Sequence, residues 1–208
     1  MKNTYNFVAQ FYSKLSRMVH GKDLLTIQVE MIKTLPNKGN LLIIGGGTGN
    51  ILPHLYQHSP NLKIDYIEAS SKMIALAKKK TTTGQQINFI HSDTIQKTDY
   101  QYNAVYCAFF LDLFAEEEIL QWLAKFDSVC QPHYSLHIAD FQLNSTVKYH
   151  FWRVILIKLS ILFFKITTNH SIWKLEDLFT VIAKNNYKTI HTRHLKDNFL
   201  RLNVFERL

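Results

Sequence analysis

Leu-Leu-Ile-Ile-Gly-Gly-Gly-Thr-Gly-Asn, residues 41–50, is the segment from which we predict the fold of this chain. An apolar run ends abruptly in glycines and is followed at 51–55 by Ile-Leu-Pro-His-Leu, where apolar residues recur at helical spacing. The pattern predicts a strand, a tight turn and a helix. Because glycine lacks a Cβ atom and tolerates positive φ, such a turn can lie directly against a bound nucleotide.

An acidic residue stands at the end of the next predicted strand. Residues 63–68 read Lys-Ile-Asp-Tyr-Ile-Glu and place Glu68 at the carboxyl end. A carboxylate at this point can accept hydrogen bonds from both hydroxyls of a ribose. The dinucleotide fingerprint Gly-x-Gly-x-x-Gly is matched only in part, because its third glycine would fall on Asn50. The sequence therefore favours a nucleotide other than a nicotinamide cofactor.

These segments resemble the motifs of class I S-adenosylmethionine-dependent methyltransferases, and the resemblance covers most of the chain. The family's first motif, acidic-x-Gly-x-Gly-x-Gly, maps onto residues 43–49, with Ile43 in place of the usual acidic residue. The second motif, acidic-x-Ser-x-x-Met, matches residues 68–73. Residues 87–94 are similar to the family strand that is followed by an Asp contacting the adenine amino group.

The resemblance implies S-adenosylmethionine as the cofactor and S-adenosylhomocysteine as its product. The residues expected to contact the cofactor are Tyr12, Gly45, Gly46, Gly47, Gly49, Glu68, Ala69, Asp93, Thr94 and Ala108. Tyr12 ends an Ala-x-x-Tyr pattern that folds over the methionine end of the cofactor in small-molecule members of the family. The alternative is that Tyr12 only packs its helix onto the sheet.

Alternating strand and helix patterns predict one doubly wound, Rossmann-like α/β sheet. Further strands are expected at 103–110 and 134–141. Two final strands, at 187–193 and 198–206, follow each other closely and must be antiparallel neighbours. We therefore expect a single domain over 1–208 with about seven strands, mostly parallel, a reversed C-terminal hairpin strand and helices on both faces.

Two segments are predicted to cover the crevice: an N-terminal helical lid at 1–35 and an inserted apolar helix at 145–170. Residues 149–166 approach the length of a membrane span, but basic residues interrupt them and a span is not expected. Three interpretations stay open for this stretch. It lines an apolar substrate pocket, it rests on a membrane surface with its lysines toward lipid phosphates, or it packs in the core or a dimer interface.

The composition is that of a globular protein, with 47% hydrophobic and 19% charged residues. Cys107 and Cys130 lack the spacing of a zinc site or a disulfide framework, which favours a cytoplasmic protein without a bound metal. The net charge of +8 is spread along the chain without a nucleic-acid-binding module, so no nucleic-acid partner is expected. The three lysines at 78–80 are interpreted as the solvated end of a helix.

The expected activity is methyl transfer to a small, lipophilic or aromatic acceptor. Such a transfer needs positioning and desolvation more than acid catalysis, so no catalytic residue is assigned. Candidates for a general base, by location alone, are Asp112, His137, Asp140 and His150. The alternatives are a non-catalytic adenosyl-cofactor-binding protein on the same fold and, less favoured, an NAD(P)-dependent oxidoreductase.

Overall fold

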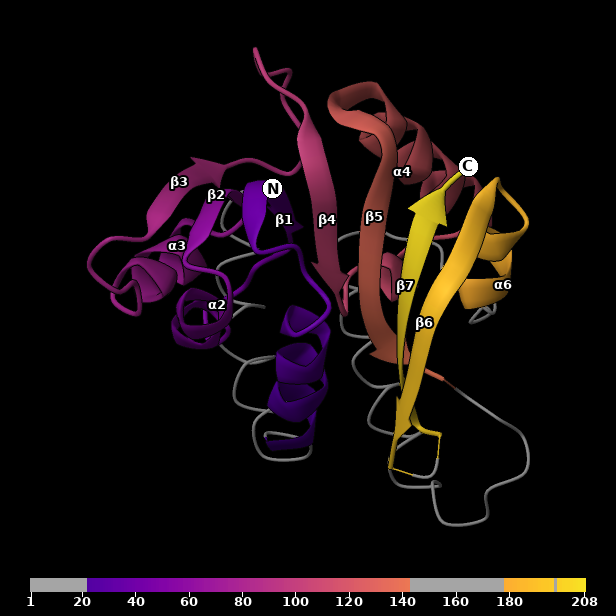
Figure 1. Ribbon diagram of the computed structural model, residues 1–208, viewed down its shortest axis with the longest axis horizontal. Helices are drawn as coiled ribbons and strands as arrows, with labels where there is room; N and C mark the ends of the chain where they lie inside the picture. Colours follow the sequence, from indigo (N-terminus) through magenta and orange to yellow (C-terminus); the bar gives the residue numbers. More distant parts are fainter. Residues whose placement is uncertain (1–21, 143–177, 197) are drawn as a thin grey trace.

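A computed structural model describes residues 22–142, 178–196 and 198–208 of the chain (Figure 1). They form one seven-stranded sheet in the order β3-β2-β1-β4-β5-β7-β6. The strands are β1 (Lys38–Ile44), β2 (Asn61–Glu68), β3 (Gln86–His91), β4 (Tyr102–Ala108), β5 (Cys130–Phe141), β6 (Tyr187–Leu195) and β7 (Leu200–Arg207).

The strand directions follow the prediction. Strands β1 to β5 pair in parallel, whereas β7 is antiparallel to both of its neighbours, β5 and β6. The β6–β7 hairpin forms one edge of the sheet and β3 the other (Figure 1). A mostly parallel sheet with one reversed C-terminal strand is therefore confirmed. Because the parallel strands end at the same edge, the turns that follow β1, β2 and β4 lie together.

Helices cover both faces of the sheet, as predicted. They are a helix at 22–32, α2 (Leu52–His58), α3 (Ser71–Lys78), α4 (Glu116–Val129) and α6 (Leu178–Ala183), with a 3-10 turn, η1 (Leu111–Leu113). Pro53 lies in the first turn of α2, where its missing N–H costs nothing. The Ser70 hydroxyl caps α3 by accepting a hydrogen bond from the Met73 N–H at 3.3 Å.

Two hydrophobic clusters fill the space between the sheet and these helices. One joins the helix at 22–32 and α2 to one face, where Ile43 and Tyr66 have no exposed surface. The other packs α4 and α6 against the opposite face, around Phe126 and Phe205. Burial on both faces explains why the central strands are apolar almost throughout.

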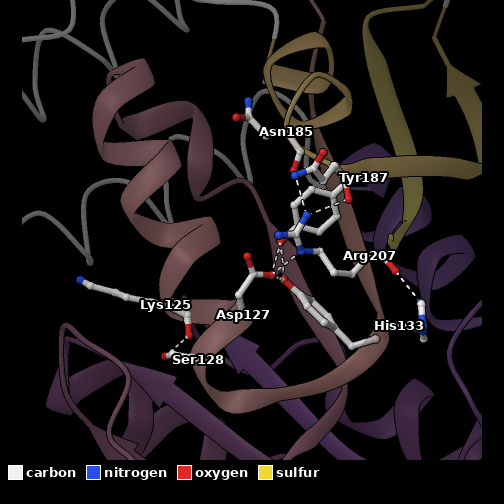
Figure 2. Close-up of polar contacts among 9 residues, drawn as sticks. Lys125, Asp127, Ser128, His133, Asn185, Tyr187 and Arg207 are labelled. Carbon is white, nitrogen blue, oxygen red and sulfur yellow. Dashed lines mark hydrogen bonds and ion pairs between the residues drawn. The ribbon is translucent and has the colours of Figure 1, made fainter.

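A polar cluster fastens the β6–β7 hairpin to α4 and β5 (Figure 2). Asp127 accepts hydrogen bonds from Tyr134 at 3.1 Å and from Tyr187 at 3.2 Å. Arg207 Nε lies 2.8 Å from the same Asp127 oxygen, and its NH1 donates to the Asn186 carbonyl at 2.9 Å. The guanidinium also packs 5.0 Å from the centroid of the Tyr187 ring. This cluster lies at the end of the sheet opposite the turn after β1.

Some element boundaries differ from the sequence-based expectation. Strand β1 begins at Lys38, three residues before the apolar run at 41–44, and the Asn40 N–H donates to Asn103 Oδ1 at 2.8 Å. Helix α6 is described from Leu178 onward. Among the described helices, none is long and apolar enough to cross a membrane.

Candidate functional site

The glycine turn, residues 45–49, follows β1 at the carboxyl edge of the sheet. Gly45, Gly47 and Gly49 have φ values of +64°, +65° and +71°, a region that residues with a side chain rarely adopt. Within the described part of the chain, a Cβ atom added at Gly47 would meet no atom within 4 Å apart from those of its two chain neighbours. The turn thus requires glycine for its shape and leaves open space beside Gly47, where a ligand can approach the backbone.

Glu68, the last residue of β2, lies against this turn. Its Oε2 accepts a hydrogen bond from the Gly47 N–H at 2.9 Å, and its Oε1 accepts one from the Ser70 N–H at 2.8 Å. Burial raises the pKa of the Glu68 carboxyl, and the backbone N–H groups of Ser70, Gly47 and Ala69 partly offset that rise. A carboxylate has about four lone-pair sites, so with three amide donors about one remains for a ligand. These residues therefore fit an adenosyl group whose ribose donates a hydrogen bond to Glu68.

Three more predicted site residues lie near the ends of β2 and β3. The Ala69 carbonyl accepts a hydrogen bond from His91 Nε2 at 3.0 Å, which links the turn after β2 to the end of β3. Asp93 and Thr94 come directly after β3 and are exposed, and the Thr94 N–H donates to Ser92 Oγ at 3.1 Å. The parallel pairing of β2 and β3 brings them to the same edge of the sheet as the glycine turn.

Ala108 is the last residue of β4, and an unusual backbone conformation follows it. Phe109 has a φ of +53°, which is held by a hydrogen bond from its N–H to the Ala139 carbonyl at 2.8 Å. Such strain concentrates at functional sites. The Phe109 ring lies 5.0 Å from that of Phe141, which lies 5.4 Å from that of Phe199. These three rings form an aromatic row at the carboxyl ends of β4 and β5.

Ile43 occupies the position at which the resembled family has an acidic residue. Its side chain has no exposed surface and lies in an apolar cluster, with Tyr66 and Tyr106 as its partners on the two neighbouring strands. A carboxylate in these surroundings would be buried without water. The local packing thus matches isoleucine, and the chain offers no carboxylate at this point.

The candidate base His137 is engaged at both ring nitrogens. The Thr34 hydroxyl donates to the Met31 carbonyl at 2.7 Å, so it accepts from His137 Nδ1 at 2.9 Å. His137 Nε2 lies 2.8 Å from Ser135 Oγ and accepts its proton. The ring is therefore neutral, and burial lowers its pKa to about 3. In this arrangement His137 joins the end of the first described helix to β5, and it has no free nitrogen for a substrate.

Asp112 and Asp140 form a carboxyl pair beyond β4 and at the end of β5. Asp140 is buried and accepts a hydrogen bond from the Phe141 N–H at 2.8 Å. Apart from their mutual contact, Asp112 Oδ1 and Asp140 Oδ2 have no hydrogen-bond partner within the described part of the chain. Burial raises the pKa of both carboxyls, and repulsion from Asp112 raises that of Asp140 further. Because adjacent buried carboxyls cannot both ionise, the pair retains one proton.

Two contacts to the glycine turn were missed by the sequence analysis. The Tyr66 hydroxyl donates to the Gly47 carbonyl at 3.0 Å. Lys80 Nζ lies 2.6 Å from the Thr48 carbonyl oxygen, so the interpretation of the three lysines as a solvated helix end is wrong for Lys80. The two-residue period of a strand could have indicated Tyr66, which precedes Glu68 by two positions and faces the same way. No sequence signal indicates Lys80.

Some predicted residues lie outside the described part of the chain: Tyr12, His150 and the helix at 145–170. Across residues 22–142, 178–196 and 198–208, no three His, Cys, Asp or Glu side chains are arranged to hold a metal ion. Cys107 and Cys130 are buried free thiols.

The strand order, with its reversed β7 and its glycine turn facing the carboxylate at the end of β2, is that of the class I methyltransferase fold. Residues 41–133, just under half of the chain, match the family model described as a methyltransferase domain. The matched range contains the glycine turn, Glu68, Asp93 and Ala108. The predicted resemblance to class I methyltransferases, whose cofactor is S-adenosylmethionine, is thereby confirmed. No curated protein sequence matches the chain.

Solved methyltransferase structures share this fold. Mitomycin 7-O-methyltransferase MmcR is 11% identical, with a TM-score of 0.65 over 90% of this chain and 55% of that chain. CalO1, a methyltransferase in calicheamicin biosynthesis solved with S-adenosylhomocysteine, is 14% identical, with a TM-score of 0.61 over 90% and 56%. The N-methyltransferase NodS from Bradyrhizobium japonicum, also solved with S-adenosylhomocysteine, is 12% identical, with a TM-score of 0.63 over 91% and 88%. The chain thus spans little more than half the length of MmcR and CalO1.

Proposed function

We propose that this protein transfers a methyl group from S-adenosylmethionine to a small acceptor. The observation that carries the proposal is the 2.9 Å contact between Glu68 and the Gly47 N–H, beside the open side of that glycine. The contact brings together a backbone without a side chain, which a ribose can approach closely, and a carboxylate that can still accept a hydrogen bond from a ribose hydroxyl. The family match of residues 41–133 supports the same cofactor independently of this geometry.

The proposed cofactor contacts come from the carboxyl ends of β1, β2, β3 and β4. Glu68 accepts a hydrogen bond from the ribose, and Asp93 contacts the adenine amino group, as the resemblance implies. The glycine turn lies against the part of the cofactor next to the ribose. Ala69, Thr94 and Ala108 border the same edge of the sheet, and Tyr12 is proposed to cover the methionine end on the basis of its sequence pattern.

When bound, S-adenosylmethionine supplies an electrophilic methyl group on a sulfonium, whose sulfur leaves as a neutral thioether. The chain contributes by positioning the acceptor and excluding water. An acceptor with an O–H or N–H group loses its proton as the new bond to carbon forms. We propose that the carboxyl pair of Asp112 and Asp140 receives this proton, because it carries one charge and one proton at the carboxyl edge.

The proposed acceptor is lipophilic or aromatic. The aromatic row supports this class, since rings at the ends of β4 and β5 favour stacking with a flat or apolar partner. MmcR, by its name, methylates mitomycin, and CalO1 takes part in calicheamicin biosynthesis, so this fold accommodates small molecules. The apolar sequence at 149–166 supports an apolar acceptor or peripheral contact with a membrane, and a cytoplasmic location completes the proposal.

Calorimetry with three ligands tests the cofactor. S-Adenosylmethionine and S-adenosylhomocysteine are expected to bind at micromolar concentrations, and NAD is not. Transfer is then followed with S-adenosylmethionine that carries a tritiated methyl group, added to a cell extract together with the protein. Label in the solvent-extractable small-molecule fraction supports the proposal. Label confined to protein or nucleic acid contradicts the acceptor class.

A second candidate function is a non-catalytic protein that binds the adenosyl cofactor. The observation in its favour is the buried Ile43, which replaces the carboxylate of the family motif. Binding of S-adenosylhomocysteine without label transfer in any extract would support this candidate over the enzyme.

A further inference from the structure

Two side chains of β2 form hydrogen bonds with the glycine turn, one to the N–H and one to the carbonyl of Gly47. Glu68 accepts from the Gly47 N–H at 2.9 Å, and the Tyr66 hydroxyl donates to the Gly47 carbonyl at 3.0 Å. The Gly49 N–H lies close to the same phenol oxygen. Tyr66 thus bridges two peptide groups of the turn, while Glu68 holds a third.

Gly46 has a different requirement from the other glycines of the turn. It is not among the residues with positive φ, so its backbone conformation would accept a side chain. A Cβ atom at this position, however, would lie 2.1 Å from Tyr66 Cζ and 2.5 Å from Tyr66 Cε2. Glycine is therefore needed here because the Tyr66 ring packs directly beneath the turn. The ring has no exposed surface and does not take part in the surface offered to a ligand.

From these contacts we infer that Tyr66 is a positioning residue for the adenosyl cofactor. Its ring packs against Gly46 and so fixes the distance between the turn and β2. Its hydroxyl fixes the orientation of the Gly47 peptide. A glycine-rich loop without such support has many conformations, and ordering it would reduce the binding affinity. The turn is instead held in one shape before a ligand arrives. The inference rests on the proposed function, because it assigns the turn to cofactor binding.

A pair of matched variants tests the hydroxyl. Tyr66→Phe removes only the oxygen that bonds the turn. Tyr106→Phe is the control, because Tyr106 is equally buried on the same face but its hydroxyl reaches Gln28, 3.4 Å away, and does not contact the turn. Titration calorimetry with S-adenosylhomocysteine is expected to show about a three- to tenfold weaker affinity for Tyr66→Phe, the usual worth of one hydrogen bond, and wild-type affinity for Tyr106→Phe.

The melting temperature separates positioning from general stability. Both phenylalanine variants lose a buried hydroxyl and are expected to melt at similar temperatures, while only one loses affinity. Equal affinities of wild type and Tyr66→Phe would overturn the inference while the proposed function stands. Failure of wild-type protein to bind S-adenosylhomocysteine would overturn both.

A double-mutant cycle tests the ring. Gly46→Ala is expected to lower the melting temperature sharply, because its Cβ would overlap the Tyr66 ring. The same substitution in a Tyr66→Leu background meets a smaller side chain, so its additional effect on the melting temperature is expected to be less than half as large. Strictly additive effects would overturn the assignment of the ring as the support of the turn.

Discussion

His137 Nδ1 donates a hydrogen bond to Thr34 Oγ1 over 2.9 Å and thereby joins the first described helix to the middle of β5. The imidazole is neutral when folded, with a pKa lowered to about 3, but it takes up a proton below about pH 6.5 when unfolded. Its contribution to stability is therefore complete above pH 6.5 and is lost as the pH falls toward 3.

We expect the unfolding free energy of wild-type protein to fall more steeply between pH 6.5 and pH 4 than that of His137→Gln. One pKa unit corresponds to about 1.4 kcal/mol, so the difference between the two slopes should be readily measured. Urea denaturation at several pH values provides the comparison, with the exposed His58→Gln as the control. Parallel curves for wild type and His137→Gln would contradict the buried neutral ring.

The carboxyl pair has the opposite pH dependence. In the folded protein, the pKa values of Asp112 and Asp140 are raised above the ordinary 3.8. The contribution of the two carboxyls to folding stability is therefore present below pH 3.8, and it is lost as the pH rises through the folded pKa values. Asp112→Asn removes the repulsion. We expect this variant to be more stable than wild type at pH 8 by about 1 kcal/mol or more, and equally stable at pH 3.5. Urea denaturation at the two pH values measures the difference, with the exposed Asp99→Asn as the control.

The same Asp112→Asn protein is expected to transfer methyl groups about 100-fold more slowly, because its amide cannot take the acceptor proton. Its affinity for S-adenosylhomocysteine should stay at the wild-type value. Initial rates of tritium transfer and calorimetry measure the two quantities on one preparation. An undiminished rate would remove the pair from the proposed mechanism and leave the rest of the site in place.

Replacing Glu68 tests the predicted ribose contact. Glu68→Ala removes the acceptor, and Glu68→Gln keeps the size but turns an NH2 group toward the N–H of Gly47 or Ser70. Both variants are expected to bind S-adenosylhomocysteine at least about tenfold more weakly, which corresponds to about 1.4 kcal/mol. Calorimetry with the exposed Glu117→Gln as a reference gives the measurement. Wild-type affinity in Glu68→Ala would refute the contact.

Arg207 belongs to the polar cluster at the other end of the sheet (Figure 2). Arg207→Ala removes the ion pair with Asp127, the hydrogen bonds to backbone carbonyls and the packing on Tyr187. We expect a loss of about 2 kcal/mol in unfolding free energy and no change in affinity for S-adenosylhomocysteine. The control Arg193→Ala breaks an exposed ion pair with Glu30 and should cost less than about 1 kcal/mol. Equal losses in the two variants would contradict a special role for the cluster.

Local sequence patterns were sufficient to predict the alternation of strands and helices, the glycine turn and the position of Glu68, because each depends on residues close together in the chain. His137 shows where location alone falls short. It lies within β5, where the alternation along the strand turns it toward Thr34 and the first described helix.

Contacts between distant segments could not be read from such patterns. Asp112 and Asp140 were candidates separately, but their meeting depends on the register between β4 and β5. Lys80 reaches Thr48 across more than thirty positions of the chain, with a flexible side chain that leaves no periodic signal. Tyr66 supports the turn because of the depth at which its ring is buried, which only the assembled sheet defines.

The place of β7 in the sheet also affects how the protein can fold during translation. The chain makes β6 before β7, yet β7 is the strand that separates β6 from β5. Until residues 200–207 pair, β6 has no strand beside it, and β5 carries an open edge that includes the apolar Leu136 and Ile138. A chain in which β7 is not yet paired is open to strand exchange with neighbouring chains, so shielding by a chaperone would be most valuable before β7 pairs.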